Sequence, residues 1–203
     1  SIVPLRVDGP RRRRSANRTV NLRSGGVAVG LGRAALQPLP DQRLVGGGAT
    51  GGQMWMTGTY DPELNLLYVG TGNPTPVLNG DARPGDNPWT CSIVALNPDT
   101  GKLVWGFQVS PHDTHDWDAA EVPVLVDGTF NGAPRKMVLQ ASRNGYYVVL
   151  DRTTGKSLLT APFAAVNWAK EIDKDGRPIP NPDKEPKRAG RLVAPNEAGA
   201  TNY

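Results

Sequence analysis

The feature that most constrains the fold of this chain is a turn motif that occurs twice. Ala95–Trp105 reads Ala-Leu-Asn-Pro-Asp-Thr-Gly-Lys-Leu-Val-Trp, and Val149–Leu159 keeps an Asp, the Thr-Gly-Lys and a final apolar residue at the same offsets. The two turn glycines, Gly101 and Gly155, lie 54 residues apart. A hairpin that recurs about every 50 residues is typical of the blades of a β-propeller. Trp105, the large apolar group that ends the first copy, is expected to dock between neighbouring blades.

The rest of the chain after residue 45 consists of short strand-like runs separated by turns rich in Gly, Pro, Asn and Asp. The expected strands are 55–60, 66–69, 90–96, 102–109, 122–126, 136–141 and 146–150. We therefore predict an all-β fold of about three four-stranded antiparallel blades, which is part of a larger propeller. Residues 170–198 are rich in Pro and charge and are expected to form an extended surface excursion. No run of about 18 apolar residues occurs, so no membrane span is expected.

The basic charge of the chain is concentrated at its start. Residues 1–45 hold nine arginines against two aspartates, whereas residues 46–203 hold 14 Lys and Arg against 17 Asp and Glu. The run Arg11–Arg14 is compatible with a nucleic-acid arm, but it has no interleaved aromatic residue. We expect residues 1–45 to be a disordered or aberrant leader, with no nucleic-acid partner, and residues 46–203 to be the partial propeller. Both ends of the sequence favour a piece of a longer protein.

The densest group of ionisable residues is Pro111–Ala119, which contains three carboxylates, both histidines and a tryptophan. A bound cation or a reactive centre is the usual reason for such density, and a solvated acidic loop is the alternative. His112 and His115 are expected to make structural hydrogen bonds rather than to form a metal pair. Cys91 lies in a strand-like run and is expected to be a buried structural thiol.

Several motifs together resemble the quinoprotein alcohol dehydrogenases, the pyrroloquinoline quinone (PQQ) enzymes of the methanol/ethanol dehydrogenase group. Ala95–Trp105 resembles their tryptophan-docking motif, and the match runs from about residue 46 to residue 203. The other similar segments are Gly70–Pro74, Arg83–Asn87, Pro111–Asp118, Ser142–Gly145 and Leu150–Thr153. The resemblance implies an eight-bladed β-propeller. It also implies that a glutamate metal ligand and a vicinal cysteine pair lie outside this sequence.

The resemblance assigns three residues to the cofactor. Trp55 corresponds to a tryptophan that forms the floor under the planar quinone, a role that suits a large rigid aromatic face. Arg143 corresponds to an arginine that hydrogen-bonds the quinone oxygens. Asn202 resembles an asparagine that makes another cofactor contact. The alternatives are a core or blade-docking role for Trp55 and an exposed turn position for Arg143.

The resemblance assigns three residues to a metal ion. Asn73 corresponds to an amide ligand, and Asp116 to a catalytic aspartate that acts as general base and also faces the metal. Calcium-type relatives carry a small neutral residue at the position of Asp118, whereas lanthanide-type relatives carry an aspartate. Residues i and i+2 of an extended segment face the same side, so both carboxylates are expected to reach one cavity. The sequence therefore predicts a lanthanide ion, with Ca²⁺ as the alternative.

By this resemblance, the chain is part of an enzyme that oxidises primary alcohols to aldehydes, with a c-type cytochrome as electron acceptor. A periplasmic location and a possible homodimer follow from the same resemblance. The alternative is a non-catalytic propeller that acts as an interaction scaffold. Such a scaffold has no reason to keep Asn73, Asp116, Asp118 and Arg143 together. We also expect the 203-residue piece to be inactive alone, because an open run of blades leaves part of the site missing.

Overall fold

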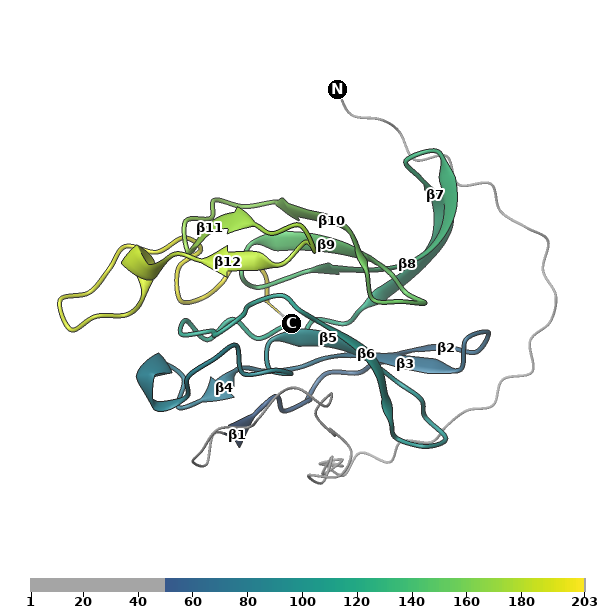
Figure 1. Ribbon diagram of the computed structural model, residues 1–203, viewed down its shortest axis with the longest axis horizontal. Coiled ribbons are helices and arrows are strands. Elements are labelled where there is room, and N and C mark those ends of the chain that lie inside the picture. Colours follow the sequence, from purple (N-terminus) through teal and green to yellow (C-terminus); the bar gives the residue numbers. More distant parts are fainter. Residues whose placement is uncertain (1–49, 203) are drawn as a thin grey trace.

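The structure, a computed structural model, describes residues 50–202, so the predicted leader lies outside the described residues. The described part is nearly all β, with two four-stranded sheets, two two-stranded sheets and two short 3-10 helices (Figure 1). The helices are η1 (Gly80–Ala82) and η2 (Pro182–Lys184). No helix among these residues is long and apolar enough to cross a membrane. The predicted fold class, antiparallel sheets of a β-propeller, is confirmed by this architecture.

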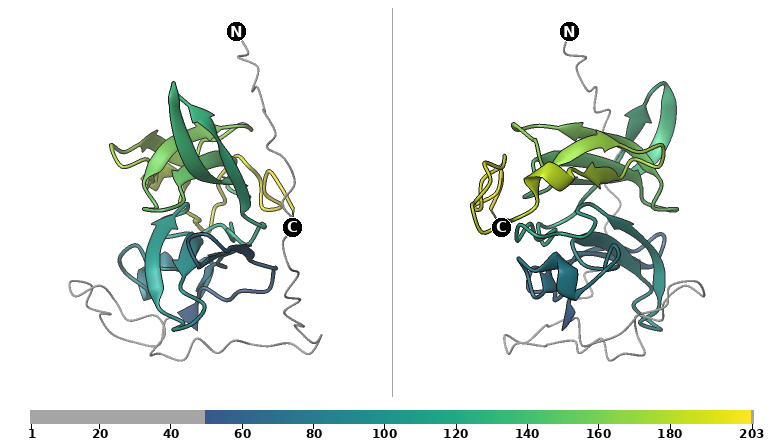
Figure 2. Two further views of the ribbon diagram at one scale, coloured as in Figure 1. Left: turned by 90° about the vertical axis from the view of Figure 1, so that its right-hand side faces the viewer. Right: turned by 60° about the vertical axis from the view of Figure 1, so that its left-hand side comes forward.

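Each four-stranded sheet is an antiparallel meander. The first contains β2 (Thr59–Asp61), β3 (Leu66–Gly70), β5 (Ser92–Leu96) and β6 (Leu103–Gln108), in that order. The second contains β7 (Val124–Phe130), β8 (Ala133–Ala141), β9 (Tyr146–Asp151) and β10 (Ser157–Pro162). The small sheets pair β1 (Thr50–Gly51) with β4 (Pro74–Thr75) and β11 (Ala169–Ile172) with β12 (Pro178–Pro180). The two large sheets lie one above the other as neighbouring blades (Figure 2).

Two expected boundaries differ clearly from the structure. The expected strand 55–60 is reduced to β2, and the chain before it pairs with another segment: the Gly52 N–H donates to the Asn73 carbonyl and the Gly72 N–H to the Gln53 carbonyl. The expected turn 127–134 is mostly strand, since β7 and β8 continue to a two-residue Asn131-Gly132 turn with positive φ at both positions. Asn-Gly is the strongest short hairpin signal, and it sets the register of this long hairpin.

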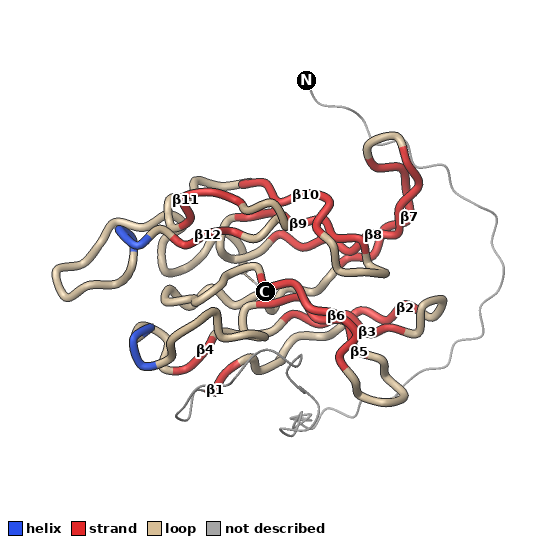
Figure 3. Tube along the Cα trace, in the orientation of Figure 1, coloured by secondary structure: helices blue, strands red, loops and turns tan. Residues whose placement is uncertain are grey.

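The region 170–198 is more than a surface excursion. It contains the hairpin β11–β12, and Ile172 and Val193 pack against a buried aromatic cluster of Trp117, Tyr146 and Trp168. Figure 3 shows that, apart from η2, the remainder of this region is loop and lies at the same end of the molecule as β11 and β12. The apolar residues scattered among its prolines and charges are what hold the region to the second blade.

The main core lies between the two blades. Its residues come from both sheets: Leu66, Tyr68, Ile93, Ala95, Trp105, Phe107, Val109, Ala119, Val138, Val148 and Leu150. All five residues of β5 are buried, because a second apolar cluster around Val69, Val94 and Leu96 covers the other face of the first blade. Burial on both faces is the pattern expected of a strand inside a stack of blades.

Trp105 joins the two blades, as the repeated turn motif predicts. Its indole Nε1 donates to the carbonyl oxygen of Arg152 at 3.1 Å, and the hydroxyl of Tyr68 donates to the same oxygen at 3.0 Å. The indole also covers Gly155, where an added Cβ would lie 2.7 Å from the ring. The second copy of the turn therefore receives the tryptophan that ends the first copy, and its glycine leaves the space for the ring.

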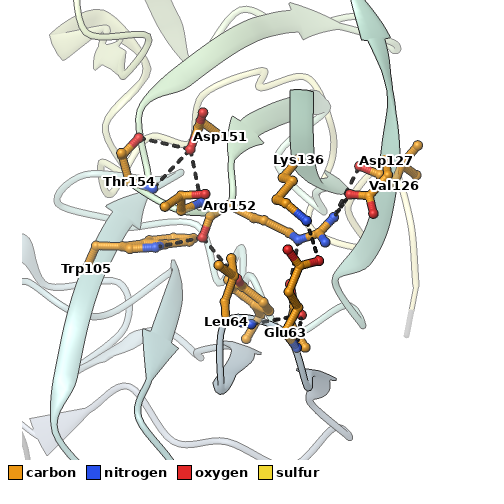
Figure 4. A network of polar contacts seen from close by, with 12 residues as sticks. Glu63, Leu64, Trp105, Val126, Asp127, Lys136, Asp151, Arg152 and Thr154 are labelled. Atoms are coloured by element: carbon orange, nitrogen blue, oxygen red, sulfur yellow. Dashed lines mark hydrogen bonds and ion pairs between the residues drawn. The ribbon is translucent and has the colours of Figure 1, made fainter. Parts of the chain in front are cut away.

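An ion pair reinforces this contact between blades (Figure 4). The guanidinium of Arg152 binds the buried carboxylate of Asp61 at 2.7 Å and also pairs with Asp127. Asp61 in addition accepts the backbone N–H groups of Glu63 at 2.8 Å and Leu64 at 3.2 Å. Burial raises the pKa of Asp61, but these N–H groups and Arg152 outweigh burial and hold the pKa below its usual value.

The lowered pKa of Asp61 predicts how this network responds to pH. The Asp61→Asn change should lower the free energy of unfolding by about 3 kcal/mol at neutral pH, because it removes the buried carboxylate that pairs with the Arg152 charge. The stabilisation by the carboxylate is present above the unfolded pKa of about 3.9 and is lost as the pH falls through the lower folded value. The stability difference between the two proteins should therefore narrow below a pH of about 4.

Chemical unfolding of the complete propeller at a series of pH values measures this difference. Glu63→Gln is the matched control, because Glu63 pairs with Lys136 at an exposed position and should contribute less than about 1 kcal/mol. A difference for Asp61→Asn that stays constant from neutral to acidic pH would show that the carboxylate charge is not what stabilises the blade contact.

Candidate functional site

The candidate site begins where the chain leaves β3. The segment 71–73 runs beside the segment 117–119: the Ala119 N–H donates to the Thr71 carbonyl at 2.9 Å, and the Asn73 N–H donates to Oδ1 of Asp118 at 2.7 Å. Asp118 is 4% exposed. Two predicted metal ligands, Asn73 and Asp118, are therefore brought into direct contact although they lie 45 residues apart.

Trp55 covers the same segment from the other side. An added Cβ at Gly72 would lie 2.5 Å and 2.7 Å from two atoms of the Trp55 ring and 3.1 Å from Oδ1 of Asp118. Gly72 thus leaves the space that lets the indole and the Asp118 carboxylate approach each other. Trp55 is nevertheless 46% exposed, so it presents aromatic surface next to a buried carboxylate. Trp55 is therefore not a core residue of the described part, and its role as a cofactor floor rather than a blade-docking residue stays a prediction.

Asp116 is exposed, and its backbone adopts a left-handed conformation with φ of 65°. Desolvation of the carboxyl group raises the pKa of Asp116 above its usual value, and the negative charge of Asp118 raises it further, while Arg143 partly offsets both. These interactions place Asp116, Asp118 and Arg143 in one electrostatic neighbourhood. The expectation that the two carboxylates share a cavity agrees with this coupling, although the segment is a loop and not an extended strand.

Arg143 comes from the turn between β8 and β9, on the second blade. Its guanidinium donates to the carbonyl of Glu197 at 3.1 Å, and its own carbonyl accepts the Ala200 N–H at 2.8 Å. The end of the described chain therefore wraps around Arg143 and holds its side chain. Arg143 does not occupy a freely exposed turn, which was the alternative for this residue.

Glu121 is a residue of this neighbourhood that the sequence analysis missed. It is buried, and its Oε1 accepts the hydroxyl of Thr201 at 2.9 Å. Burial raises the pKa of Glu121, and the positive charge of Arg143 acts in the opposite direction. The feature of the sequence that could have identified Glu121 is its position, three residues after Asp118 and just before β7. Arg143 thus lies between two carboxyl groups, Asp116 and Glu121.

Asn202, the third residue predicted to contact the cofactor, is exposed at the end of the described residues, and its role stays a prediction. Its neighbour Thr201 contacts Glu121. The chain therefore brings the backbone before Asn202 to the edge of the site.

The two histidines have the structural contacts expected of them. The Nδ1 of His112 lies 2.7 Å from the Gly85 carbonyl. The ring of His115 stacks on Trp117, with ring centroids 4.3 Å apart, and its Nε2 lies 3.0 Å from the Lys184 carbonyl. Burial lowers the pKa of His115. Cys91 is fully buried, and burial raises the pKa of its thiol, as expected for a structural residue.

A cavity of about 450 Å³ lies on the opposite side of this segment. His115 and Trp117 line it together with residues 184–198, whereas Asp116 and Asp118 do not. Successive side chains of the segment thus face different surroundings. Asp118 faces Trp55 and Asn73, and the aromatic pair faces the region that carries η2.

The donor atoms of the site fit a hard cation. Asn73, Asp116 and Asp118 offer carboxylate and amide oxygens, which are the ligands that Ca²⁺ and similar ions prefer. Asp118 raises the pKa of Asp116, so the two anions repel each other, and a cation between them would remove this cost. Among the described residues there is no group of three or more His, Cys, Asp and Glu side chains that could hold a metal, so these residues alone offer two carboxylates and one amide.

Stacked four-stranded blades joined by a docking tryptophan, with an oxygen-rich site beside an exposed indole, define a quinoprotein type of propeller. Residues 38–198 match the PQQ family described as the glucose/ethanol/alcohol dehydrogenase β-propeller domain. The chain therefore belongs to this family.

Individual relatives agree with this assignment. Quinohemoprotein alcohol dehydrogenase ADH IIB of Pseudomonas putida is 43% identical over 157 residues, which are 75% of this chain and 23% of that protein. The lanthanide-dependent methanol dehydrogenase of Methylacidiphilum fumariolicum is 41% identical over 162 residues, which are 78% of this chain and 26% of that protein. The solved structure of a europium-containing methanol dehydrogenase aligns with a TM-score of 0.69 at 42% identity, over 73% of this chain and 26% of that one. The chain thus spans about a quarter of the length of these relatives.

The contact between Gly72 and Trp55 predicts the effect of filling that space. The Gly72→Ala change should lower the free energy of unfolding by about 2 kcal/mol, because the new methyl group meets the indole and the Asp118 carboxylate. In a Trp55→Ala background the same change should be less costly, since the ring is gone.

Chemical unfolding of the four proteins measures this coupling. Gly128→Ala is the matched control, because the nearest atom to its added Cβ is the flexible end of Met137 at 3.7 Å. Equal costs of Gly72→Ala with and without Trp55 would show that the indole does not rest on this glycine.

Proposed function

We propose that this chain is part of a PQQ-dependent alcohol dehydrogenase that oxidises primary alcohols to aldehydes. The observation that carries this proposal is the exposed carboxyl group of Asp116, whose pKa is raised and which lies near both Asp118 and Arg143. A carboxylate whose pKa is raised toward neutrality is a better general base than an ordinary one. The names of the relatives, which are alcohol and methanol dehydrogenases, support the same reaction.

In the proposed mechanism Asp116 takes the proton from the substrate hydroxyl. When bound, the quinone supplies the acceptor for the hydride, and the metal acts on it as a Lewis acid. Arg143 is held by the backbone of residues 197–200, so its charge is fixed where it balances Asp116 and reaches the cofactor oxygens. Trp55 offers the flat surface on which the ring system would lie. Asn202 would complete the cofactor contacts from the edge of the site.

We further propose that the metal is a lanthanide ion held by Asn73, Asp116 and Asp118. Two nearby carboxylates concentrate negative charge, and this suits a trivalent ion better than a divalent one. The names of two relatives, a lanthanide-dependent and a europium-containing methanol dehydrogenase, support this choice over Ca²⁺. Further ligands would come from parts of the propeller outside this chain.

The enzyme would work as a complete propeller in the periplasm, with a c-type cytochrome as electron acceptor. Residues 46–203 would form the propeller piece, with residues 1–45 outside it. Because the described part contains two four-stranded blades, it holds one wall of the site, and the isolated chain should show no PQQ-dependent turnover.

Metal reconstitution tests the proposed function. The complete apoprotein, loaded with PQQ, should oxidise a primary alcohol faster with La³⁺ than with Ca²⁺. The Asp118→Ala change should lower the La³⁺-dependent rate at least about tenfold, since it removes one ligand charge. The rates are measured with an artificial dye as electron acceptor, together with the metal content of each protein.

Asp175→Ala is the control, because Asp175 is an exposed acid paired with Lys174 and should leave the rate unchanged. Faster oxidation with Ca²⁺ would overturn the lanthanide assignment but not the enzyme. PQQ binding and alcohol oxidation that are absent with either ion would instead favour the non-catalytic scaffold.

A further inference from the structure

One buried carboxylate next to the site makes contacts that the proposed reaction does not use. Oδ1 of Asp113 accepts the His115 N–H at 3.1 Å, and Oδ2 accepts the Trp117 N–H at 3.2 Å. These are the two backbone N–H groups on either side of Asp116. Asp113 is 3% exposed, so its two oxygens are committed to this segment and not to solvent.

We propose that Asp113 is a positioning residue that holds Asp116 in its left-handed backbone conformation and so aims its carboxyl group at the site. This inference rests on the proposed function of Asp116 as the base. A positive φ of 65° is uncommon for a residue with a side chain and persists only when the surroundings fix it. The carboxylate of Asp113 fixes it, because it binds the chain immediately before and immediately after Asp116.

The backbone of Asp113 is in turn bound by the Arg83 side chain. This arginine is 2% exposed, and one of its terminal nitrogens donates to the backbone carbonyl of Asp113. The same guanidinium donates to the carbonyls of Pro76 and Val77 and to the side chain of Asn87. Because the Arg83 guanidinium makes four hydrogen bonds, it cannot move away from the Asp113 backbone without breaking several of them.

A second set of contacts holds the segment from the opposite side. The hydroxyl of Thr114 donates to Oε2 of Glu185 at 2.7 Å, and His115 reaches the Lys184 carbonyl. These contacts fix residues 114 and 115 but do not reach beyond Asp116. The Asp113 side chain thus binds the backbone on both sides of Asp116, and the His115 ring, which stacks on Trp117, adds a second contact across the same residue.

The chemical nature of the side chain matters because each of its two oxygens accepts a backbone N–H. An asparagine of the same shape offers one acceptor and one NH₂ group, so one of the two N–H groups would face another donor. A buried N–H that loses its acceptor is expensive, and the segment would relax to recover a partner. Relaxation would release the left-handed conformation and displace the Asp116 carboxyl group.

Asp61 provides a matched control in the same chain. Its carboxylate is also buried, and it also accepts two nearby backbone N–H groups, those of Glu63 and Leu64. It lies in the contact between the blades and not at the site. Asp61→Asn removes the charge of this buried carboxylate from the contact between the blades, and therefore reports a loss of stability that arises away from Asp116.

The experiment compares Asp113→Asn and Asp113→Ser with Asp61→Asn in the complete protein loaded with PQQ and La³⁺. The turnover per bound PQQ should fall at least about tenfold for both Asp113 variants, because a misplaced base costs rate, whereas KM should change less than about threefold. PQQ and metal content per chain should stay near those of the unchanged protein. Asp61→Asn should lose stability but keep its turnover per bound PQQ.

A crystal structure of Asp113→Asn gives a second readout that does not depend on activity. The expected result is that Asp116 leaves the left-handed region or that its carboxyl group moves away from Asp118. Retention of both the present φ and the position of the Asp116 carboxyl group, or a turnover per bound PQQ equal to that of Asp61→Asn, would overturn the inference. If the unchanged protein shows no alcohol oxidation, the proposed function fails, and the crystal structure still decides whether Asp113 positions Asp116.

Discussion

The arrangement of the two blades depends on the hydrogen bonds to one backbone atom, the carbonyl oxygen of Arg152, at the centre of their contact. A single four-stranded sheet of this kind cannot bury both of its faces, so its apolar residues are stable only against a neighbour. The indole of Trp105 and the hydroxyl of Tyr68, both on the first blade, donate to this one backbone oxygen of the second. The Arg152 side chain then binds Asp61 of the first blade. Apolar burial supplies the attraction between the sheets, and these polar contacts set their register.

The site is a consequence of the same stacking. Trp55 and Asn73 belong to the end of the first blade, and Arg143 belongs to a turn of the second. The connection between β6 and β7, which carries Asp116 and Asp118, passes between them. The blades are fixed by their own core, and the loop is fixed by hydrogen bonds to segment 71–73 and by Asp113. The acidic pair is thus held by rigid elements on both sides, as a reactive site requires.

The sequence predicted the features that depend on the repeated turn and on local residue chemistry. The turn copies indicated the propeller and the docking of Trp105, since each copy carries its own turn residues. The length of the β7–β8 hairpin was missed because the Asn131-Gly132 turn was not recognised inside a polar stretch. The role of Asp113 was missed although its partners lie two and four residues along the chain, because it depends on the backbone conformation at Asp116. The role of Glu121 was not predictable, because its partner Thr201 is brought close by tertiary folding. The packing of residues 170–198 was missed for the same reason.

The double acceptance at the Arg152 carbonyl has a mechanical consequence. A carbonyl oxygen has two lone pairs, and here ring donors from the other blade use both, so no water is needed at this point of the seam. Sliding one blade along the other would break both bonds together and would also separate the Arg152 and Asp61 charges. The position of Arg143 relative to Trp55 is therefore resistant to shear. A flat molecule lying on the Trp55 ring would meet the Arg143 guanidinium at its edge in a fixed place, without a closing movement.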